Sequence, residues 1–217
     1  MWFDNNDPRL LESLSEVISV PEVEVVSHRI YQHPSELIYL VGEIRNKSEY
    51  NINVEINAYL FEKDKVKGFG WSSTLIPIIV PEQKTPFRVL FHDIKGRFDK
   101  YSLKTKFGII KQDPFREFKI LEHNHYKSES GNFIVEGKVK NIGLYDISIV
   151  KAIGTFYEAN GIIVAFDTKS TNPENLKVNE EGEFKLTVPS KLLSSMVKYY
   201  SLDFWTPTGL NLVSIKW

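Results

Sequence analysis

The amino-acid sequence predicts an all-β protein: two tandem antiparallel β-sandwiches preceded by a short amphipathic helix at the N-terminus. Short segments rich in Val, Ile, Tyr and Phe are separated by turn-forming residues along most of the chain, which is typical of strands. No long helical period lies between these segments, which argues against parallel βαβ units. The chain also matches itself at an offset of 95 residues, which indicates that one unit is present twice.

The first expected element is a helix over residues 7–19. Asp7 is a favourable N-cap, Pro8 suits the first helical turn, and a stripe of apolar residues follows at helical spacing. A helix this short is marginal in water, so the stripe has to pack on the first sandwich or on another protein. The candidate partner-docking residues are Trp2, Phe3, Leu10, Leu14 and Ile18.

The strands of each copy follow from hydrophobic runs that are broken by turns. In the first copy we expect strands at 23–31, 37–45, 52–61, 86–91 and 101–110. In the second copy we expect them at 118–126, 133–140, 147–157, 182–188, 199–205 and 210–217. Asn160 and Gly161 predict a tight hairpin, because a type I′ turn needs positive φ at both central positions. Residues 190–197 lack strand alternation and are expected to form a short helical turn.

The repeat itself is supported by eight identities over 34 aligned positions, where chance predicts about two. The identical pairs are His28 and His123, Tyr31 and Tyr126, Ser35 and Ser130, Gly42 and Gly137, Asn46 and Asn141, Tyr50 and Tyr145, Ile52 and Ile147, and Phe61 and Phe156. With small length changes the match extends to Trp71 with Phe166, Phe87 with Phe184, and Tyr101 with Tyr200. We therefore expect a helix or stalk over 1–21, a first domain over 22–114 and a second domain over 115–217. The linker is short, so the domains are expected to stack end to end.

One run of residues in each copy carries a family resemblance. Gly-x-hydrophobic-x-Asn at 42–46 and at 137–141 is followed four residues later by Tyr, and then by a strand that ends in an aromatic residue and an acidic turn. This order resembles the FxLYD domain, a small Ig-like sandwich of extracytoplasmic bacterial and archaeal proteins. The resemblance implies two Ig-like domains and a place at the cell surface, secreted or anchored to the membrane in the full-length product. It implies a structural role for Gly42, Asn46, Tyr50, Phe61, Gly137, Asn141, Tyr145 and Phe156, and carries over no catalytic residue.

Composition and missing motifs narrow the function. The formal charge is −1, with 27 basic and 28 acidic residues, so no long-range field favours nucleic acid. There is no cysteine, which excludes disulfides, thiolate metal sites and a thiol nucleophile. The usual nucleophile, zinc and nucleotide motifs are missing too. We expect a non-enzymatic, cofactor-free interaction or scaffolding protein outside the cytoplasmic membrane, an accessory part of a cell-envelope complex that does not itself span the membrane.

Two alternatives from other classes stay open. A small-ligand binder would hold a metal through His123 and His125, which lie on one face of a strand, or a glycan through exposed aromatic residues. The aromatic candidates are Trp2, Phe3, Trp205 and Trp217. The weaker alternative is a hydrolase without a recognisable motif. A groove lined by surface aromatic residues would favour a glycan, and a flat aromatic patch would favour a protein partner.

Overall fold

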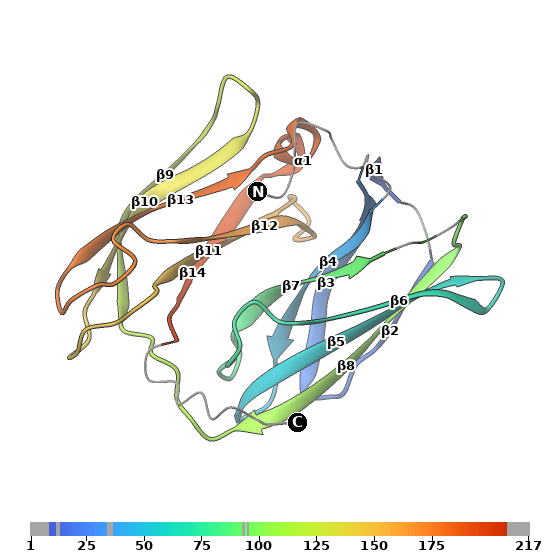
Figure 1. Cartoon of the computed structure of the whole chain (residues 1–217), viewed down its shortest axis with the longest axis horizontal. Helices are drawn as coiled ribbons and strands as arrows, with labels where there is room; N and C mark the ends of the chain where they lie inside the picture. Colours follow the sequence, from blue (N-terminus) through green and yellow to red (C-terminus); the bar gives the residue numbers. More distant parts are fainter. Residues whose placement is uncertain (1–8, 12–13, 34–36, 93, 95, 208–217) are drawn as a thin grey trace.

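The computed structural model describes residues 9–11, 14–33, 37–92, 94 and 96–207, and it is all-β (Figure 1). The first sandwich packs a sheet of strand order β1-β3-β4-β7 against a sheet of order β2-β8-β5-β6. Every pair is antiparallel except β2 and β8, which run parallel. Its strands are β1 (Arg9–Leu10), β2 (Leu14–Ile18), β3 (Val23–Gln32), β4 (Ile38–Asn46), β5 (Asn51–Glu62), β6 (Lys65–Ser73), β7 (Lys84–Phe91) and β8 (Lys100–Ile110).

The second sandwich packs two antiparallel sheets of three strands, in the orders β13-β10-β9 and β12-β11-β14. Its elements are β9 (Phe118–Lys127), β10 (Phe133–Asn141), β11 (Lys151–Tyr157), β12 (Ile163–Ser170), β13 (Glu181–Val188), α1 (Lys191–Met196) and β14 (Tyr199–Trp205). The expected short helix is α1, which begins after Ser190, whose side chain accepts a hydrogen bond from the backbone N–H of Leu193. The strand expected over 210–217 lies outside the described residues.

The expected N-terminal helix is wrong where the structure describes it. Residues 9–10 form β1, which pairs with β3, and residues 14–18 form β2, which pairs with β8. Leu11 packs against the first core, whereas Val17 and Ile18 stay 40% and 47% exposed. A short isolated helix gains little in water, while the open edges of two sheets offer a row of unpaired backbone groups. Pairing with these sheet edges outweighs the helical spacing of the apolar residues, so the segment forms strands.

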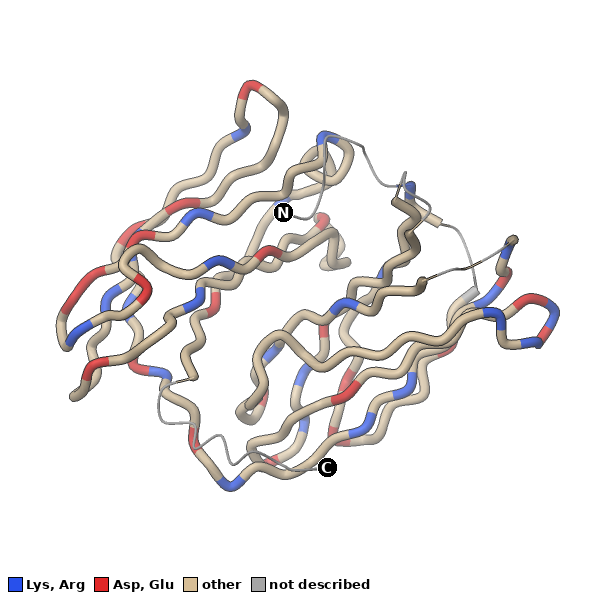
Figure 2. Tube along the Cα trace, viewed as in Figure 1, with Lys and Arg blue, Asp and Glu red and all other residues tan. Residues whose placement is uncertain are grey.

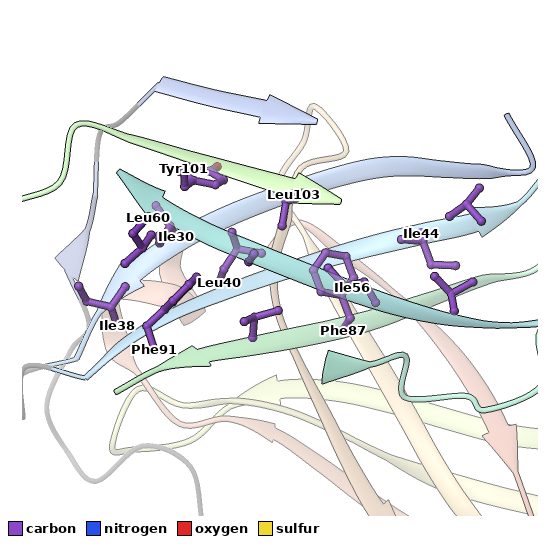
Figure 3. Close-up of a cluster of buried hydrophobic side chains, with 14 of the residues drawn as sticks. Ile30, Ile38, Leu40, Ile44, Ile56, Leu60, Phe87, Phe91, Tyr101 and Leu103 are labelled. Atoms are coloured by element: carbon purple, nitrogen blue, oxygen red, sulfur yellow. The ribbon is translucent and has the colours of Figure 1, made fainter. Parts of the chain in front are cut away.

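Alternation along the strands builds the first core. Along β4, Ile38, Leu40 and Ile44 face the opposite sheet, where they meet side chains of β5 and β8; side chains of β7, the neighbour of β4 in its own sheet, join the same core (Figure 3). The residues between them are buried as well, because Tyr39 and Val41 pack into the core cluster of the second sandwich. β4 is therefore covered on both faces, which its nearly unbroken apolar sequence reflects.

The two sandwiches lie side by side, and the linker after β8 turns the chain back on itself (Figure 1). The end-to-end stacking expected from the short linker is not what the structure shows. β12 contacts both β3 and β4, and the core cluster around Phe156 includes Tyr31, Tyr39 and Val41 from the first sandwich. The stability of each sandwich therefore depends partly on the other. Within the described residues no helix is long and apolar enough to cross a membrane.

Strand pairing refines the register of the duplication. Leu60 lies opposite Tyr101, and Phe156 lies opposite Tyr200. Leu60 and Phe156 are both fully buried, and a β-bulge follows each of these two residues. The structural counterpart of Phe156 is therefore Leu60, one residue before the Phe61 that sequence identity selects. The second copy has one extra residue just before β11, where Ile149 takes a left-handed φ of 52°.

Candidate functional site

The two motif asparagines hold the same turn in each sandwich. The Nδ2 atom of Asn46 donates to the carbonyls of Tyr50 (2.7 Å) and Ile79 (2.9 Å), and its Oδ1 accepts from the backbone N–H of Ser48 (2.9 Å). Both asparagines are fully buried. Asn141 repeats the pattern with the carbonyls of Tyr145 and Leu176 and the N–H of Gly143, at 3.0, 3.1 and 2.9 Å. Tyr50 and Tyr145 contribute backbone oxygens, and their side chains are about half exposed. The polar side-chain atoms of Asn46 and Asn141 are thus all used in hydrogen bonds that stabilise the fold.

The two motif glycines allow close approach, each of a different neighbour. A Cβ atom on Gly42 would lie 2.3 Å from Cζ of Phe87, which is opposite it on β7. A Cβ atom on Gly137 would lie 2.3 Å from the backbone oxygen of Glu122 on β9. Gly137 also lies opposite Phe184, so the expected match of Phe87 with Phe184 holds in space.

A histidine–tyrosine pair occurs once in each sandwich. The Nδ1 atom of His28 lies 2.8 Å from the hydroxyl of Tyr101, and Nδ1 of His123 lies 2.8 Å from the hydroxyl of Tyr200. The first pair is largely buried, and burial lowers the pKa of His28, whereas His123 is exposed. The ring of His125 stacks on Phe133.

The metal hypothesis gains no third ligand from this arrangement. Within the described residues no group of three or more His, Asp or Glu side chains is placed to hold an ion. His123 already uses Nδ1 in its contact with Tyr200, and its neighbour His125 packs edge-on against the same ring. The two histidines therefore belong to an exposed aromatic cluster beside β9 and β14.

The interface between the sandwiches buries a polar cluster. The hydroxyl of Tyr157 on β11 donates to Oε1 of Glu43 on β4, a residue that is only 1% exposed. The Nζ atom of Lys84 lies 3.5 Å from the other carboxylate oxygen, an ionic contact too long for a good hydrogen bond. Burial, with Glu43 alongside, raises the pKa of Tyr157, so the phenol remains a neutral donor. Burial also raises the pKa of Asp203 on β14, to which Glu43 adds.

Further bonds connect the sandwiches around this cluster. Arg29 pairs with Glu158 at 2.9 Å, and the hydroxyl of Tyr31 donates to the carbonyl of Val164 at 3.1 Å. Burial raises the pKa of Tyr31 to about 12, so this donor keeps its proton. The backbone N–H of Ile163 donates to Oγ of Ser27 at 3.1 Å. The interface thus combines aromatic packing with hydrogen bonds that fix its register.

A cleft of about 810 Å³ opens between β6, β7 and β12, where the two sandwiches meet. Trp71 and Phe69 on β6 line it and are 62% and 50% exposed. On the other wall the guanidinium of Arg88 lies 5.3 Å from the ring centre of Phe166, and burial lowers the pKa of Arg88 to about 10. Asp167 adds a carboxylate, whose pKa burial raises. Exposed rings beside a few polar groups can bind a ligand that has both apolar faces and hydroxyls.

The structure does not bring the remaining predicted site residues together into one site. Trp2, Phe3 and Trp217 lie outside the described residues, as does the side chain of Leu14, whose backbone is in β2. Leu10 and Ile18 are exposed on separate strands, so the docking stripe is not formed as expected. The Nε1 atom of Trp205 is buried. Trp71 and Phe69 were missed as candidates, although their alternation with glycines in Gly68-Phe-Gly-Trp71 was a signal of outward-facing rings on an edge strand.

Comparison with known proteins brings no family. No family model matches the chain, and no curated protein matches it. Among solved structures, red sea bream transglutaminase is 10% identical at a TM-score of 0.26, with 86% of this chain and 29% of that chain covered. A β-glucuronidase of Bacteroides uniformis is 14% identical at a TM-score of 0.23, with 70% and 21% covered. The chain spans less than a third of the length of these proteins.

Proposed function

We propose that the chain is a non-enzymatic interaction or scaffolding protein, built of two FxLYD-like, Ig-like sandwiches and acting outside the cytoplasmic membrane. One observation carries the proposal: the polar residues shared by the two copies bond the fold itself. Asn46 and Asn141 satisfy backbone groups, and His28 and His123 contact tyrosines. An enzyme that kept a duplicated active site would be expected to leave such side chains free for a substrate. The residues that the two copies share therefore maintain the fold, whose surfaces can bind a partner.

The distribution of surface charge suits a protein partner that carries both basic and acidic groups. Basic and acidic residues are interspersed over both sandwiches in the described part of the chain (Figure 2). No single-sign field of the kind that attracts polyanions results from this pattern. The resemblance to extracytoplasmic FxLYD domains supports a place at the cell envelope, as an accessory part of a membrane-associated complex.

Protease treatment of intact cells tests the location. Cells that carry the full-length gene with an epitope tag on this chain would be treated with protease, with a cytosolic protein as the marker of intactness. We expect the tagged chain to be degraded or released while the marker survives. A chain that is protected until the cells are lysed would contradict the extracytoplasmic proposal.

A second candidate function, glycan binding, is favoured by the cleft. Trp71 and Phe69 line a groove beside Arg88 and Asp167, and exposed rings of this kind stack on sugar faces. Titration with soluble oligosaccharides, followed by tryptophan fluorescence, tests it. Binding that Phe69→Ala abolishes, with Trp71 kept as the reporter, and that the exposed control Tyr145→Ala preserves would support this function. If no oligosaccharide perturbs the fluorescence, the scaffolding proposal stands alone.

A further inference from the structure

In the first sandwich two short strands close the side formed by β3 and β8. β2 pairs with β8 in parallel, from Leu14 opposite Lys100 to Ile18 opposite Lys104, and β1 pairs with β3. The side chain of Ser15 hydrogen-bonds to Tyr101, which is only 5% exposed. Leu11 and Val20 pack against the core from the same segment. The histidine–tyrosine pair of this sandwich is therefore covered.

The same side of the second sandwich is open. Within the described residues β14 pairs only with β11, and β9 pairs only with β10. Almost every residue of β9 is exposed, whereas its counterpart β3 is mostly covered. Four large side chains of β9 and β14 are between 37% and 46% exposed: Ile120, Leu121, Tyr126 and Tyr199.

The duplication explains the opening. The residues that correspond to 14–18 at the repeat offset are 109–113, and Ile109 and Ile110 already belong to β8 of the first sandwich. Among the described residues, β14 therefore has no counterpart of β2 at that point of the repeat. A small pocket of about 180 Å³ lies at the far end of this side, where Ile120 and Trp205 meet Gln83 of the first sandwich. The Nε1 atom of Trp205 is buried there without a hydrogen-bond partner among the described residues.

We propose that the side formed by β9 and β14, hereafter the open edge, binds an extended segment of a partner protein, which adds to β14 as a parallel strand. The inference rests on the proposed interaction function and names its mode of docking. The first sandwich shows the occupant's chemistry: an extended segment of about five residues that pairs its backbone along β8 and lays apolar side chains over the tyrosine. On the open edge such a segment covers Tyr200 and Ile120.

A second copy of the chain is a poorer occupant. Its own residues 14–18 are already paired with β8, so moving them to another molecule exchanges one ladder for another. The charges differ as well, because Glu16 pairs with Lys100 at 2.8 Å, and Tyr199 stands at the position of Lys100 on β14. A separate partner segment adds backbone bonds without breaking any.

The experiment uses the full chain and, as the probe strand, a synthetic peptide of residues 9–20 with Glu16→Thr, which removes the charge that pairs with Lys100. Amide hydrogen exchange is followed on β14 and β8 with and without peptide at about 1 mM. We expect exchange of the outward amides of β14 to slow by about tenfold or more, with β8 unchanged. A control peptide with Ser15 and Val17 replaced by proline, which cannot form the ladder, is expected to give no protection.

Three outcomes would overturn the proposal: no protection of β14, equal protection by the proline peptide, or protection confined to β8. Ile120→Lys provides a second test, because it places a charge on the open edge at a residue that is 38% exposed and should leave folding intact. It should weaken protection by about tenfold, and unchanged protection contradicts the proposal. Failure here leaves the location test above unaffected, so the docking mode and the interaction function are judged separately.

Discussion

The two sandwiches share a frame and differ at their edges. Each buries one asparagine that bonds two carbonyls and one N–H, and each sets a histidine against a tyrosine at 2.8 Å. In the described part of the chain only the first has further strands on the side of β3 and β8, so His28 is partly buried there while His123 of the second sandwich is exposed. The comparison separates the residues that make the fold from the surfaces that were free to diverge.

The largest effect is expected from removing the shared asparagines. Asn46→Ala and Asn141→Ala each remove three hydrogen bonds between a fully buried side chain and the backbone, so each should lower the free energy of unfolding by about 3 kcal/mol. Urea denaturation measures both, with the exposed Asn124→Ala as the control, expected within about 0.5 kcal/mol of the wild type. A large difference between the two variants in the loss of unfolding free energy would contradict the claim that the two asparagines play the same role.

The glycines sharpen the comparison, because their neighbours differ. Gly42→Ala and Gly137→Ala should each cost about 2 kcal/mol or more through overpacking. Phe87→Leu should partly rescue the first, since the clash there is with a side chain. Phe184→Leu should not rescue the second, where the clash is with backbone. Double-mutant cycles decide, and equal rescue at both positions would contradict this account.

Tyr157 tests the interface between the sandwiches. Its counterpart in the first sandwich is Phe61, so Tyr157→Phe places the residue of the first sandwich at the equivalent position of the second. The change removes the hydroxyl that donates to Glu43. We expect a loss of about 1 to 3 kcal/mol in the free energy of unfolding, against almost none for the exposed Tyr145→Phe. If both changes were equally mild, the buried bond would contribute nothing to holding the sandwiches together.

The smallest effect concerns pH. Burial holds the pKa of His28 in the folded protein below the unfolded value of 6.5, so stability is complete above that pH and falls as the pH drops below it. The slope is at most about 1.4 kcal/mol per pH unit. His28→Gln should flatten the loss between about pH 7 and pH 5, and His123→Gln should not. The buried Asp167 and Asp203 act with the opposite sign in all variants, so parallel curves would contradict the role of His28.

Much of the fold was predictable from local patterns. Strand alternation and the repeat located both sandwiches, and the spacing of Gly42, Asn46 and Tyr50 marked a motif that proves to hold a turn. The N-terminal helix failed because its apolar spacing also suits strands once two open sheet edges are nearby, which is a tertiary effect. The one-residue shift between Leu60 and Phe156 needed strand pairing to detect.

The candidate sites were less predictable. Nothing in the order of residues places β12 against β6 and β7, so the cleft with Trp71 and Phe69 depends on how the sandwiches fold back on each other. The apolar outward residues of β4, Tyr39 and Val41, did signal a covered outer face, but not what covers it. Distant contacts of this kind have no local sequence pattern.

The most direct test of the difference between the sandwiches is amide hydrogen exchange of the free chain, comparing equivalent residues of β8 and β14. Amides of 100–104 are expected to be protected on both sides of β8, since β5 and β2 flank it. On β14 the amides that point away from β11 should exchange about tenfold or more faster than those that point toward it. Uniform protection along β14, equal to that of β8, would show that the open edge is already closed and would contradict the account.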